Sequence, residues 1–416
     1  MTIRHSRRLV IVGGGLAGVS AAVEAARTGL QTLLVEQRAS LRAPRRLLAA
    51  LAASGAEAWV DTAAWGLWGR DLALHGSGDR SSVVAFQQLI VATGAYERPV
   101  AFPGWTLPGV MTLSGAERLL EQGVRPGRRV VVAGYAAFVA RAASVMRASD
   151  VVPVAVLDAA ARGGRVVVRA EGEQDLRQVV TARVDADWYP RPKTEETLQA
   201  DTLVLAFGQE PEQRLAGLAG CNSEGSVYLN PWTTRDAWMR TSVPGVLVAG
   251  DAGGVVGAEV SLQQGRLAGL GAALEAGRLS ADEAQRRAGP IRRRMARMTG
   301  AGNGLPPLRP GLLSLAEPDT VICRCEDVSA GQVAERLFAG SVDPASPIAE
   351  TRAGMGLCQA RNCATLIAAA VARHAGIPLE RIPPITPRPP IVPVPIGVIA
   401  ERPPVFPSLT DLPVAG

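Results

Sequence analysis

A glycine-rich turn near the N-terminus constrains this chain more than any other feature of its sequence. Gly13, Gly15 and Gly18 form the turn. It follows an apolar run at 9–12 and precedes a helical pattern over 19–28. In a dinucleotide-binding βαβ unit, the first glycine permits a sharp turn and the second lets the backbone approach a pyrophosphate. The third lets the helix pack on the strand. The turn therefore predicts a doubly wound α/β fold with a nucleotide at the start of the helix.

Glu36 stands where such a fold needs an acceptor for a ribose. It ends the strand expected at 31–35, at the spacing from which a carboxylate binds ribose hydroxyls. Two later strand ends, 93–94 and 250–251, fit the same site, because this order of segments resembles flavoproteins with two dinucleotide domains. A purely structural glycine turn is the alternative interpretation. The expected cofactor-binding residues are Gly13, Gly15, Leu16, Ala17, Gly18, Glu36, Gln37, Thr93, Gly94, Gly250 and Asp251.

A second βαβ start, at 130–134, lacks the glycines that a nucleotide requires. Its fingerprint positions hold Gly134, Ala136 and Val139. The side chains at 136 and 139 obstruct pyrophosphate approach and helix packing. Asp158 lies at the distance of a ribose acceptor, which leaves binding of an adenosine compound open. We favour a retained scaffold over an NAD(P)H site.

Four cysteines form two close pairs near the C-terminus. Cys323 and Cys325 are separated by one residue, Cys358 and Cys363 by four, and 32 residues lie between the pairs. Two such pairs can supply four thiolate ligands to one metal centre. Zinc sites usually place about two to four residues within a pair, so the first pair is awkward for zinc. The spacing favours a [2Fe–2S] cluster, with zinc, a redox disulfide or no metal as alternatives. Nearby arginines that would raise its potential are Arg324, Arg352 and Arg361.

Composition and charge exclude several classes of function. The net charge of +6 comes almost entirely from arginine, and the arginine-rich stretch at 286–297 has no interleaved aromatic residues, so nucleic acid is not expected. No apolar run predicts a transmembrane segment or a signal peptide. We expect a cytoplasmic protein, with any membrane contact made through its electron acceptor. His5, His75 and His374 are the only histidines, and none lies beside a cofactor motif, so no catalytic residue is assigned.

The order of these features predicts a division of the chain into domains. The expected FAD or nucleotide domain is discontinuous, and a degenerate NAD-like domain is inserted in it. A linker, a small helical [2Fe–2S] domain and a proline-rich tail follow. The tail is expected to lie extended over a surface, with no helix or strand. The boundaries are 1–98 with 241–285, then 99–240, 286–320, 321–376 and 377–416.

Several segments resemble a known family of bacterial enzymes. The cysteine segments at 321–326 and 351–363 resemble the bacterioferritin-associated-ferredoxin-like [2Fe–2S] domain. Their form is the one fused to the large subunit of bacterial heteromeric amino-acid dehydrogenases. Segments 102–109, 265–269 and 389–395 resemble the same family. It includes subunits of D-hydroxyproline and proline dehydrogenases, octopine and nopaline oxidases, and hydrogen cyanide synthase.

The resemblance implies a division of labour between two polypeptides. A smaller flavoprotein that resembles D-amino-acid oxidase removes hydride from the amine, and the two chains form a hetero-oligomer. The large subunit supplies the cluster and a nucleotide, which is FAD or, in some relatives, ATP, and an FMN lies between subunits. Relatives carry a Gly-Gly-Gln turn after the glutamate strand that helps to shape the flavin pocket. This chain departs from them, because it runs through 39–46 directly into a helix.

These features predict the electron-transfer and nucleotide-binding subunit of an enzyme that oxidises the C–N bond of an amino acid, imino acid or opine. Two electrons taken up by the partner's flavin would pass singly through the cluster. One alternative is an NAD(P)H-dependent ferredoxin or nitrite-reductase-type flavoprotein, which the damaged second turn disfavours. Another is a structural scaffold for a catalytic partner. A thiol–disulfide oxidoreductase is excluded, because it needs a cysteine pair near the flavin and Cys221 is the first cysteine.

Overall fold

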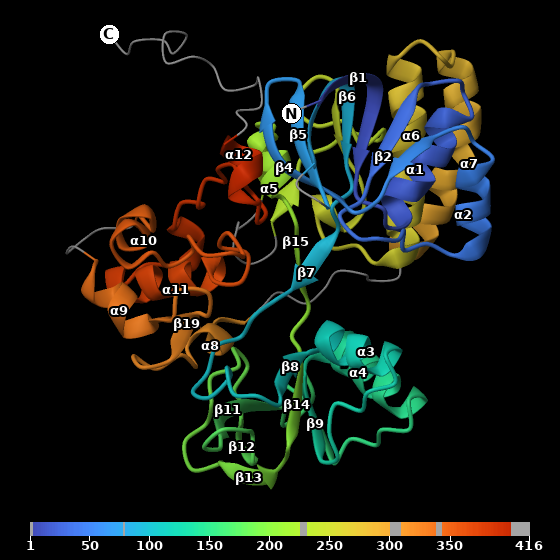
Figure 1. Cartoon of the computed structure of the whole chain (residues 1–416). Helices are drawn as coiled ribbons and strands as arrows, with labels where there is room; N and C mark the ends of the chain where they lie inside the picture. Colours follow the sequence, from blue (N-terminus) through green and yellow to red (C-terminus); the bar gives the residue numbers. More distant parts are fainter. Residues whose placement is uncertain (1–2, 78–79, 225–230, 300–308, 338–342, 401–416) are drawn as a thin grey trace, which may run out of the picture. The chain divides into compact units, whose positions relative to one another are not determined.

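The chain forms two compact units in a computed structural model (Figure 1). Unit 1 comprises Met1–Ala95, Pro211–Pro306 and Thr386–Gly416, and unit 2 comprises Tyr96–Glu210 and Pro307–Ile385. The structure describes residues 3–77, 80–224, 231–299, 309–337 and 343–400. The predicted α/β fold is confirmed, whereas the finer division into a linker and a separate cysteine domain stays a prediction.

A seven-stranded sheet forms the centre of unit 1, in the order β3-β2-β1-β6-β5-β4, with β18 also paired to β6. Its strands are β1 (Ile3–Val12), β2 (Thr32–Val35), β3 (Glu57–Trp59), β4 (Thr62–Trp68), β5 (Asp71–Gly76), β6 (Arg80–Val91) and β18 (Val246–Val248). The β1, β2, β3, β6 and β18 strands run parallel, and β4 and β5 add an antiparallel hairpin. The central strands are continuous apolar runs because both faces of the sheet are covered.

Two glycines let the helices on one face of this sheet approach closely. A Cβ on Gly265 would overlap the carbonyl oxygen of Ala17, and one on Gly269 would overlap that of Ala21. The backbones of α6 and α1 therefore touch, and Figure 1 shows α6 beside α1. No helix in the described ranges combines the length and apolar character that a membrane span requires. The helices of this face are α1 (Leu16–Ala26), α2 (Arg45–Ala52), α6 (Ala258–Glu275) and α7 (Ala281–Thr299).

The other face of the sheet packs against α5 (Arg214–Leu218) and part of the proline-rich tail. The amide of Ile391 donates to the carbonyl oxygen of Trp65 on β4 (2.9 Å), and Ile391 is buried. The expectation that the tail contains no helix is wrong, because α12 (Ile396–Ala400) forms there. This short run lies between prolines and buries Val398 beside Trp65, so tertiary packing stabilises it. Short elements elsewhere in unit 1 are β16 (Ser223–Glu224), β17 (Trp232–Thr233) and η1 (Gly250–Gly253).

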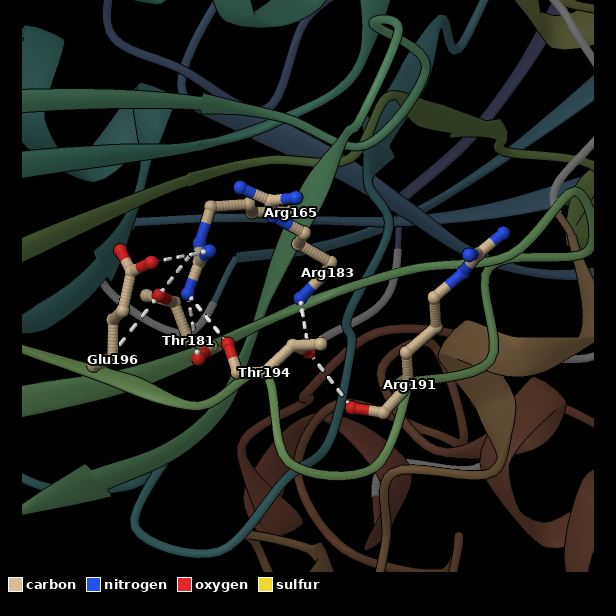
Figure 2. Close-up of polar contacts among 6 residues, drawn as sticks. All are labelled: Arg165, Thr181, Arg183, Arg191, Thr194 and Glu196. Atoms are coloured by element: carbon tan, nitrogen blue, oxygen red, sulfur yellow. Dashed lines mark hydrogen bonds and ion pairs between the residues drawn. The ribbon is translucent and has the colours of Figure 1, made fainter.

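Unit 2 contains a parallel sheet in the order β10-β9-β14-β8 and an antiparallel sheet in the order β11-β12-β13. In the second sheet, Arg165 reaches across two neighbouring strands, to the Thr181 hydroxyl (3.1 Å) and the Glu196 carboxylate (3.0 Å), as Figure 2 shows. This network ties the three strands together. The strands of unit 2's two sheets are β8 (Val110–Thr112), β9 (Val130–Gly134), β10 (Ala155–Asp158), β11 (Arg165–Glu171), β12 (Gln178–Arg183), β13 (Glu196–Gln199) and β14 (Thr202–Ala206). The helices beside the parallel sheet are α3 (Leu113–Glu121) and α4 (Ala136–Ala148), and a separate ladder pairs β7 (Ala95–Glu97) with β15 (Gln209–Pro211).

The cysteine segment of unit 2 is mostly helical. A capping box between Ser329 and Gln332 starts its first helix after a short antiparallel ladder. Arg373 of its last long helix donates to the carbonyl oxygens of Leu313 (2.9 Å) and Ala316 (3.1 Å), so this helix is tied to the preceding segment. The elements are α8 (Pro310–Leu313), β19 (Val321–Cys323), β20 (Val328–Ser329), α9 (Ala330–Glu335), α10 (Ala345–Thr351), α11 (Ala364–Ala375) and η2 (Leu379–Arg381).

Candidate nucleotide and cysteine sites

Four parallel strands of unit 1 end level with one another. Val12 of β1 lies opposite Val35 of β2 and Val91 of β6. Val91 lies in turn opposite Val248 of β18. Ligands of doubly wound sheets bind outside the carboxyl ends of the strands, where the strand order reverses. The expected nucleotide contacts follow these four strands, so the fold brings those segments to one edge of the sheet.

The three glycines of the first turn have distinct steric roles. Gly13 has a φ of +115°, and a Cβ there would overlap the carbonyl oxygen of Ala92. A Cβ on Gly18 would overlap the carbonyl oxygen of Gly13, so close helix packing requires glycine. At Gly15 a Cβ would meet no described atom within 4 Å, which leaves the front of the turn open. Helix α1 begins at Leu16 without a side-chain cap, so its first amides can face a phosphate.

The Glu36 carboxylate lies over this turn. It is buried, and its oxygens accept hydrogen bonds from the amides of Gly14 (2.6 Å) and Arg38 (2.8 Å). An ionised carboxylate has lone pairs for further donors, so a ribose hydroxyl can share this acceptor. Gln37, also expected to bind the cofactor, is exposed on the segment that follows.

The segment between Glu36 and α2 folds back on the glycine turn, a contact that the sequence did not reveal. The amide of Arg42 donates to the carbonyl oxygen of Gly14 (2.9 Å). Leu41 packs so closely that a Cβ on Gly14 would lie 2.5 Å from its Cδ2. Leu41 therefore bounds the site on the side of Gly14.

Thr93 and Gly94, at the end of β6, are bonded to the chain at Glu212. The Thr93 hydroxyl donates to the carbonyl oxygen of Glu212 (2.7 Å). The amide of Glu212 donates back to the carbonyl oxygen of Gly94 (2.9 Å). These bonds hold the end of β6 in place beside Gly13.

Gly250 and Asp251, at the end of β18, connect the sheet to α6. A Cβ on Gly250 would lie 2.8 Å from that of Ala17, so this strand end touches α1. The Asp251 carboxylate accepts a hydrogen bond from the amide of Gly257 (3.0 Å), the residue before α6. Gln264, which the sequence did not single out, accepts a hydrogen bond from the amide of Gly250 (3.0 Å) while buried. Buried glutamines in an otherwise apolar helix were the signal that could have found it.

The described residues at this edge fit a dinucleotide or an adenine nucleotide. Gly15 leaves an open cradle, the start of α1 supplies amides for phosphate, and Glu36 supplies the acceptor for ribose. Leu41 bounds the site on the side of Gly14. The sequence-based expectation for the nucleotide site therefore agrees with the geometry of the turn, and the ligand itself stays a prediction.

The second turn, in unit 2, repeats the hydrogen bonds of the first. Oδ1 of Asp158 accepts from the amides of Ala136 (3.0 Å) and Ala160 (2.8 Å). Asp158 stands 22 residues after its amide partner in the turn, as Glu36 stands 22 residues after Gly14. Ala136 takes a φ of +49°, where a side chain is unfavourable. The scaffold of a nucleotide site is therefore present.

Aromatic side chains fill the space in front of this second turn. The ring of Tyr135 lies 5.4 Å from that of Phe138 and 5.0 Å from that of Trp188, measured between centroids. Tyr135 and Trp188 are buried. The cavity left beside Phe138 and Gly208 has a volume of about 30 Å³. It has room for water but not for a nucleotide.

The four cysteines come together in unit 2. Cys323 ends β19, Cys325 lies in the next turn, and Cys363 stands directly before α11. Cys363 is within hydrogen-bonding range of both Cys323 and Cys358, and Cys358 interacts with Cys325. Cys323 and Cys363 are buried, Cys358 is half-buried and Cys325 is exposed. The fold thus joins the two sequence pairs into one group with a buried and an exposed side.

Hydrogen bonds among the four thiols give them different pKa values. Sharing the Cys363 proton lowers the pKa of Cys323 to about 6 and that of Cys358 to about 5, and raises the pKa of Cys363. Burial raises the pKa of Cys325. Within the described residues, no group of three or more His, Cys, Asp or Glu side chains is arranged closely enough to hold a metal ion. The chemistry of the donor set nevertheless fits an iron–sulfur cluster, because the four thiols form one chain of contacts, from Cys323 through Cys363 and Cys358 to Cys325.

The backbone around the cysteines is strained in the way that ligand loops often are. Gln359 and Ala360, between Cys358 and Cys363, have φ values of +52° and +61°. Such non-glycine conformations cost about 1–3 kcal/mol each and persist where the surrounding structure requires them. The amide of Gly354 donates to the sulfur of Cys323 (3.4 Å). Amides aimed at sulfur are also a means of tuning iron–sulfur clusters.

Two family models match two different parts of this chain. Residues 7–277 match the family model described as pyridine nucleotide-disulphide oxidoreductase. Residues 350–402 match the model described as the sarcosine oxidase A3 domain. A crystal structure of L-proline dehydrogenase from P. horikoshii has the same fold, with a TM-score of 0.75 and 22% identity. The match covers 96% of this chain and 80% of that one.

Two curated relatives extend over most of the chain. The HcnB subunit of hydrogen cyanide synthase from Pseudomonas protegens is 31% identical, over 85% of this chain and 89% of the relative. An opine oxidase subunit from Rhizobium meliloti is 30% identical, over 94% of this chain and 98% of the relative. The chain is therefore an oxidoreductase subunit of the flavoprotein class. It belongs to the pyridine nucleotide-disulphide oxidoreductase family, in the group that contains HcnB and this opine oxidase subunit.

Proposed function

We propose that this chain is the electron-transfer and nucleotide-binding subunit of a hetero-oligomeric flavin and iron–sulfur dehydrogenase or oxidase. The enzyme would oxidise the C–N bond of an amino acid, imino acid or opine. Two similar proteins are named for opines and for L-proline, and both compounds are secondary amines. We also propose the domain boundaries given above and a cytoplasmic location, where free thiols persist.

The observation that carries this proposal is the meeting of four thiols in one group of unit 2. Two are buried and two reach the surface side, so a cluster held by Cys323, Cys325, Cys358 and Cys363 would be anchored in the protein and accessible at one edge. When bound, a [2Fe–2S] cluster supplies one-electron transfer.

The first glycine turn is proposed to hold FAD, with ATP or another adenine nucleotide as the alternative. In either case Gly15 and the start of α1 would receive phosphate, and Glu36 would receive a ribose hydroxyl. A bound flavin would supply hydride or electron transfer. Leu41 packs beside Gly14 and Glu36, so it bounds the side of the site that would receive the ribose.

Substrate chemistry is assigned to a partner subunit that resembles D-amino-acid oxidase, with an FMN at the subunit interface. The relatives are themselves named as subunits. In this chain, the two acids at the turns are engaged by main-chain amides, which suits positioning rather than proton transfer. We therefore assign no catalytic acid or base to the described residues.

The direct test is iron, sulfide and zinc analysis of the chain co-purified with its partner, combined with electron paramagnetic resonance. About two irons per chain and a [2Fe–2S] spectrum are expected. Each of the four Cys→Ser variants should lose the spectrum while the partner still binds its substrate. Cys221→Ser is the matched control, because this fifth cysteine lies in unit 1, and it should keep the cluster. Zinc in place of iron, or unchanged iron in Cys358→Ser, would contradict the proposal.

An NAD(P)H-dependent reductase is the second candidate, and the filled second turn disfavours it. Tyr135, Phe138 and Trp188 pack together at a turn that lacks two of the three glycines an NAD(P)H site would need. Anaerobic mixing of the complex with NADH and NADPH should leave any flavin oxidised, whereas an amine substrate of the partner should reduce it. Rapid reduction by either nicotinamide would support the second candidate.

A further inference from the structure

Two aromatic rings of unit 2 lie against the two arginines that stand inside the cysteine pairs. Arg324 stands between the first two ligand cysteines, and its guanidinium carbon is 5.3 Å from the centre of the Trp105 ring. Arg361 stands between the second two, and its guanidinium carbon is 5.8 Å from the centre of the Tyr96 ring. Both distances are within the range of a cation–π contact. The same pairing thus occurs once at each cysteine pair.

Trp105 is fixed in place at its polar end. It is buried, and its indole Nε1 donates to the carbonyl oxygen of Val321 (2.6 Å). Val321 begins β19, the strand that ends in Cys323. One side chain therefore holds both the backbone that leads to the first ligand and the arginine beside it.

Tyr96 is fixed by a buried network. Its hydroxyl donates to Oε2 of Glu210 (3.1 Å), and Oε1 of Glu210 accepts from Arg98 (3.1 Å) and from the hydroxyl of Thr365 (3.2 Å). The side chains of Arg98 and Glu210 are 1% and 8% exposed, so this ion pair is shielded from water. Thr365 lies in the first turn of α11, the helix that begins directly after Cys363. The network therefore joins the Tyr96 ring to the helix that follows the fourth ligand.

A guanidinium held close to a cluster affects its reduction. Reduction adds one negative charge, so a nearby cation favours the reduced form, and the preference grows as the charge is held in place. An arginine that moves away into solvent is screened and contributes much less. Arg352 is 71% exposed and is paired with Glu326 at 3.1 Å, so the carboxylate offsets its charge.

We propose that Tyr96 and Trp105 are positioning residues that hold Arg361 and Arg324 beside the cysteine group and so raise the reduction potential of its cluster. This inference rests on the proposed function, because it requires the cluster. It goes beyond that function by assigning control of the potential to the segment 96–109, which runs from β7 to the start of β8. The module at 321–376 would then have a lower potential when this segment is altered, although no cysteine has changed.

The test is an anaerobic redox titration of the co-purified complex, followed by electron paramagnetic resonance. Arg324→Gln and Arg361→Gln should each lower the equilibrium constant for reduction about tenfold, which is 59 mV for a one-electron couple. Trp105→Leu and Tyr96→Leu should each lower it about threefold, because the charge stays but is released to solvent. Arg352→Gln is the charge control and should change it less than twofold. Tyr96→Phe keeps the ring but loses the hydrogen bond to Glu210, and should lower the constant less than Tyr96→Leu does.

The outcomes separate this inference from the proposed function. Wild-type protein without iron would contradict the proposed function itself. Iron-loaded Trp105→Leu and Tyr96→Leu with wild-type potentials would overturn the inference alone, as would a shift in Arg352→Gln equal to that in Arg361→Gln. If Trp105→Leu fails to fold, the potentials of Arg324→Gln and Tyr96→Leu test the inference instead. Arg324 is exposed and Tyr96 is half-buried, so both variants should fold.

Discussion

The first glycine turn and the turn of the second βαβ unit share one pattern of hydrogen bonds, but they differ in the side chains around them. In each, an acidic side chain at the end of the next strand accepts from one amide of the turn and one just after itself. At the first turn, a Cβ on Gly15 would meet no described atom, whereas Tyr135 and Phe138 fill the second. We infer that the second turn keeps the hydrogen bonds of a dinucleotide-binding scaffold because they support its packing.

Packing between aromatic rings contributes to the stability of the second turn. Tyr135 is 1% exposed and touches two other rings, so it contributes core packing where a pyrophosphate would lie. Leu41 makes a smaller change of the same kind at the first turn, where it narrows the site without closing it. Substitutions at both turns test this comparison.

Tyr135→Ala should have the largest effect. Removing a buried aromatic side chain costs about 3–5 kcal/mol, so unfolding of unit 2 in urea should begin at markedly lower concentration. Hydrogen exchange should show the loss in β9 and α4, and nucleotide content should be unchanged. New binding of NADH by this variant would mean that the ring alone closes the site.

Gly15→Val should come next. The valine has space in the empty protein and Gly15 has an ordinary φ of −84°, so the melting temperature should stay near that of wild type. Its methyl groups would occupy the phosphate cradle, and nucleotide affinity should fall about 100-fold, or roughly 2.7 kcal/mol. Isothermal titration with FAD and with ATP measures this. Retained affinity would place the ligand elsewhere.

Glu36→Gln and Asp158→Asn form a matched pair. Glu36 accepts through both carboxylate oxygens, so Glu36→Gln turns one acceptor into a donor that faces a main-chain amide and should lose about 1–3 kcal/mol of unfolding free energy. Asp158 accepts both amides through Oδ1 alone, so Asp158→Asn can keep that oxygen and should lose less. Only Glu36→Gln should also weaken nucleotide binding, by about tenfold, because only its turn is open. Equal losses of nucleotide affinity in both variants would contradict the distinction between the turns.

Among the variants that change the free energy of unfolding, Ala136→Gly should change it least, and it should raise that free energy where the others lower it. Ala136 has a φ of +49°, so glycine should stabilise the chain by about 1 kcal/mol. Thermal unfolding measures this gain. No nucleotide should bind to the second turn, because Tyr135 still fills it. Nucleotide binding would show that the alanine, rather than the aromatic side chains, had closed the site.

Local patterns predicted the fold and much of the site. The glycine turn, the acid at the end of β2 and the paired cysteines each lie within a short stretch, and their chemistry depends on that spacing. The apolar strands could be predicted because buried parallel strands are continuous runs of apolar residues. The antiparallel hairpin of β4 and β5 was not predicted, although Gly69 in its two-residue loop takes a φ of +58° and was a turn signal.

Contacts across long sequence separations could not be predicted in the same way. Trp105 and Val321 are 216 residues apart, and Glu210 and Thr365 are 155 apart. A single sequence carries no record of such pairings, because they depend on how whole elements pack. Leu41 was missed for another reason: a missing turn indicates that a segment is short but not which side chain replaces it.

We propose that this chain has one working nucleotide site, at the first turn. The most direct measurement is mass spectrometry of the nucleotides released from the co-purified complex, quantified per copy of this chain after subtraction of those held by the partner alone. We expect about one adenine-containing nucleotide per chain in wild type and in Tyr135→Ala, and none in Gly15→Val. Two per chain in wild type, or one retained in Gly15→Val, would contradict it.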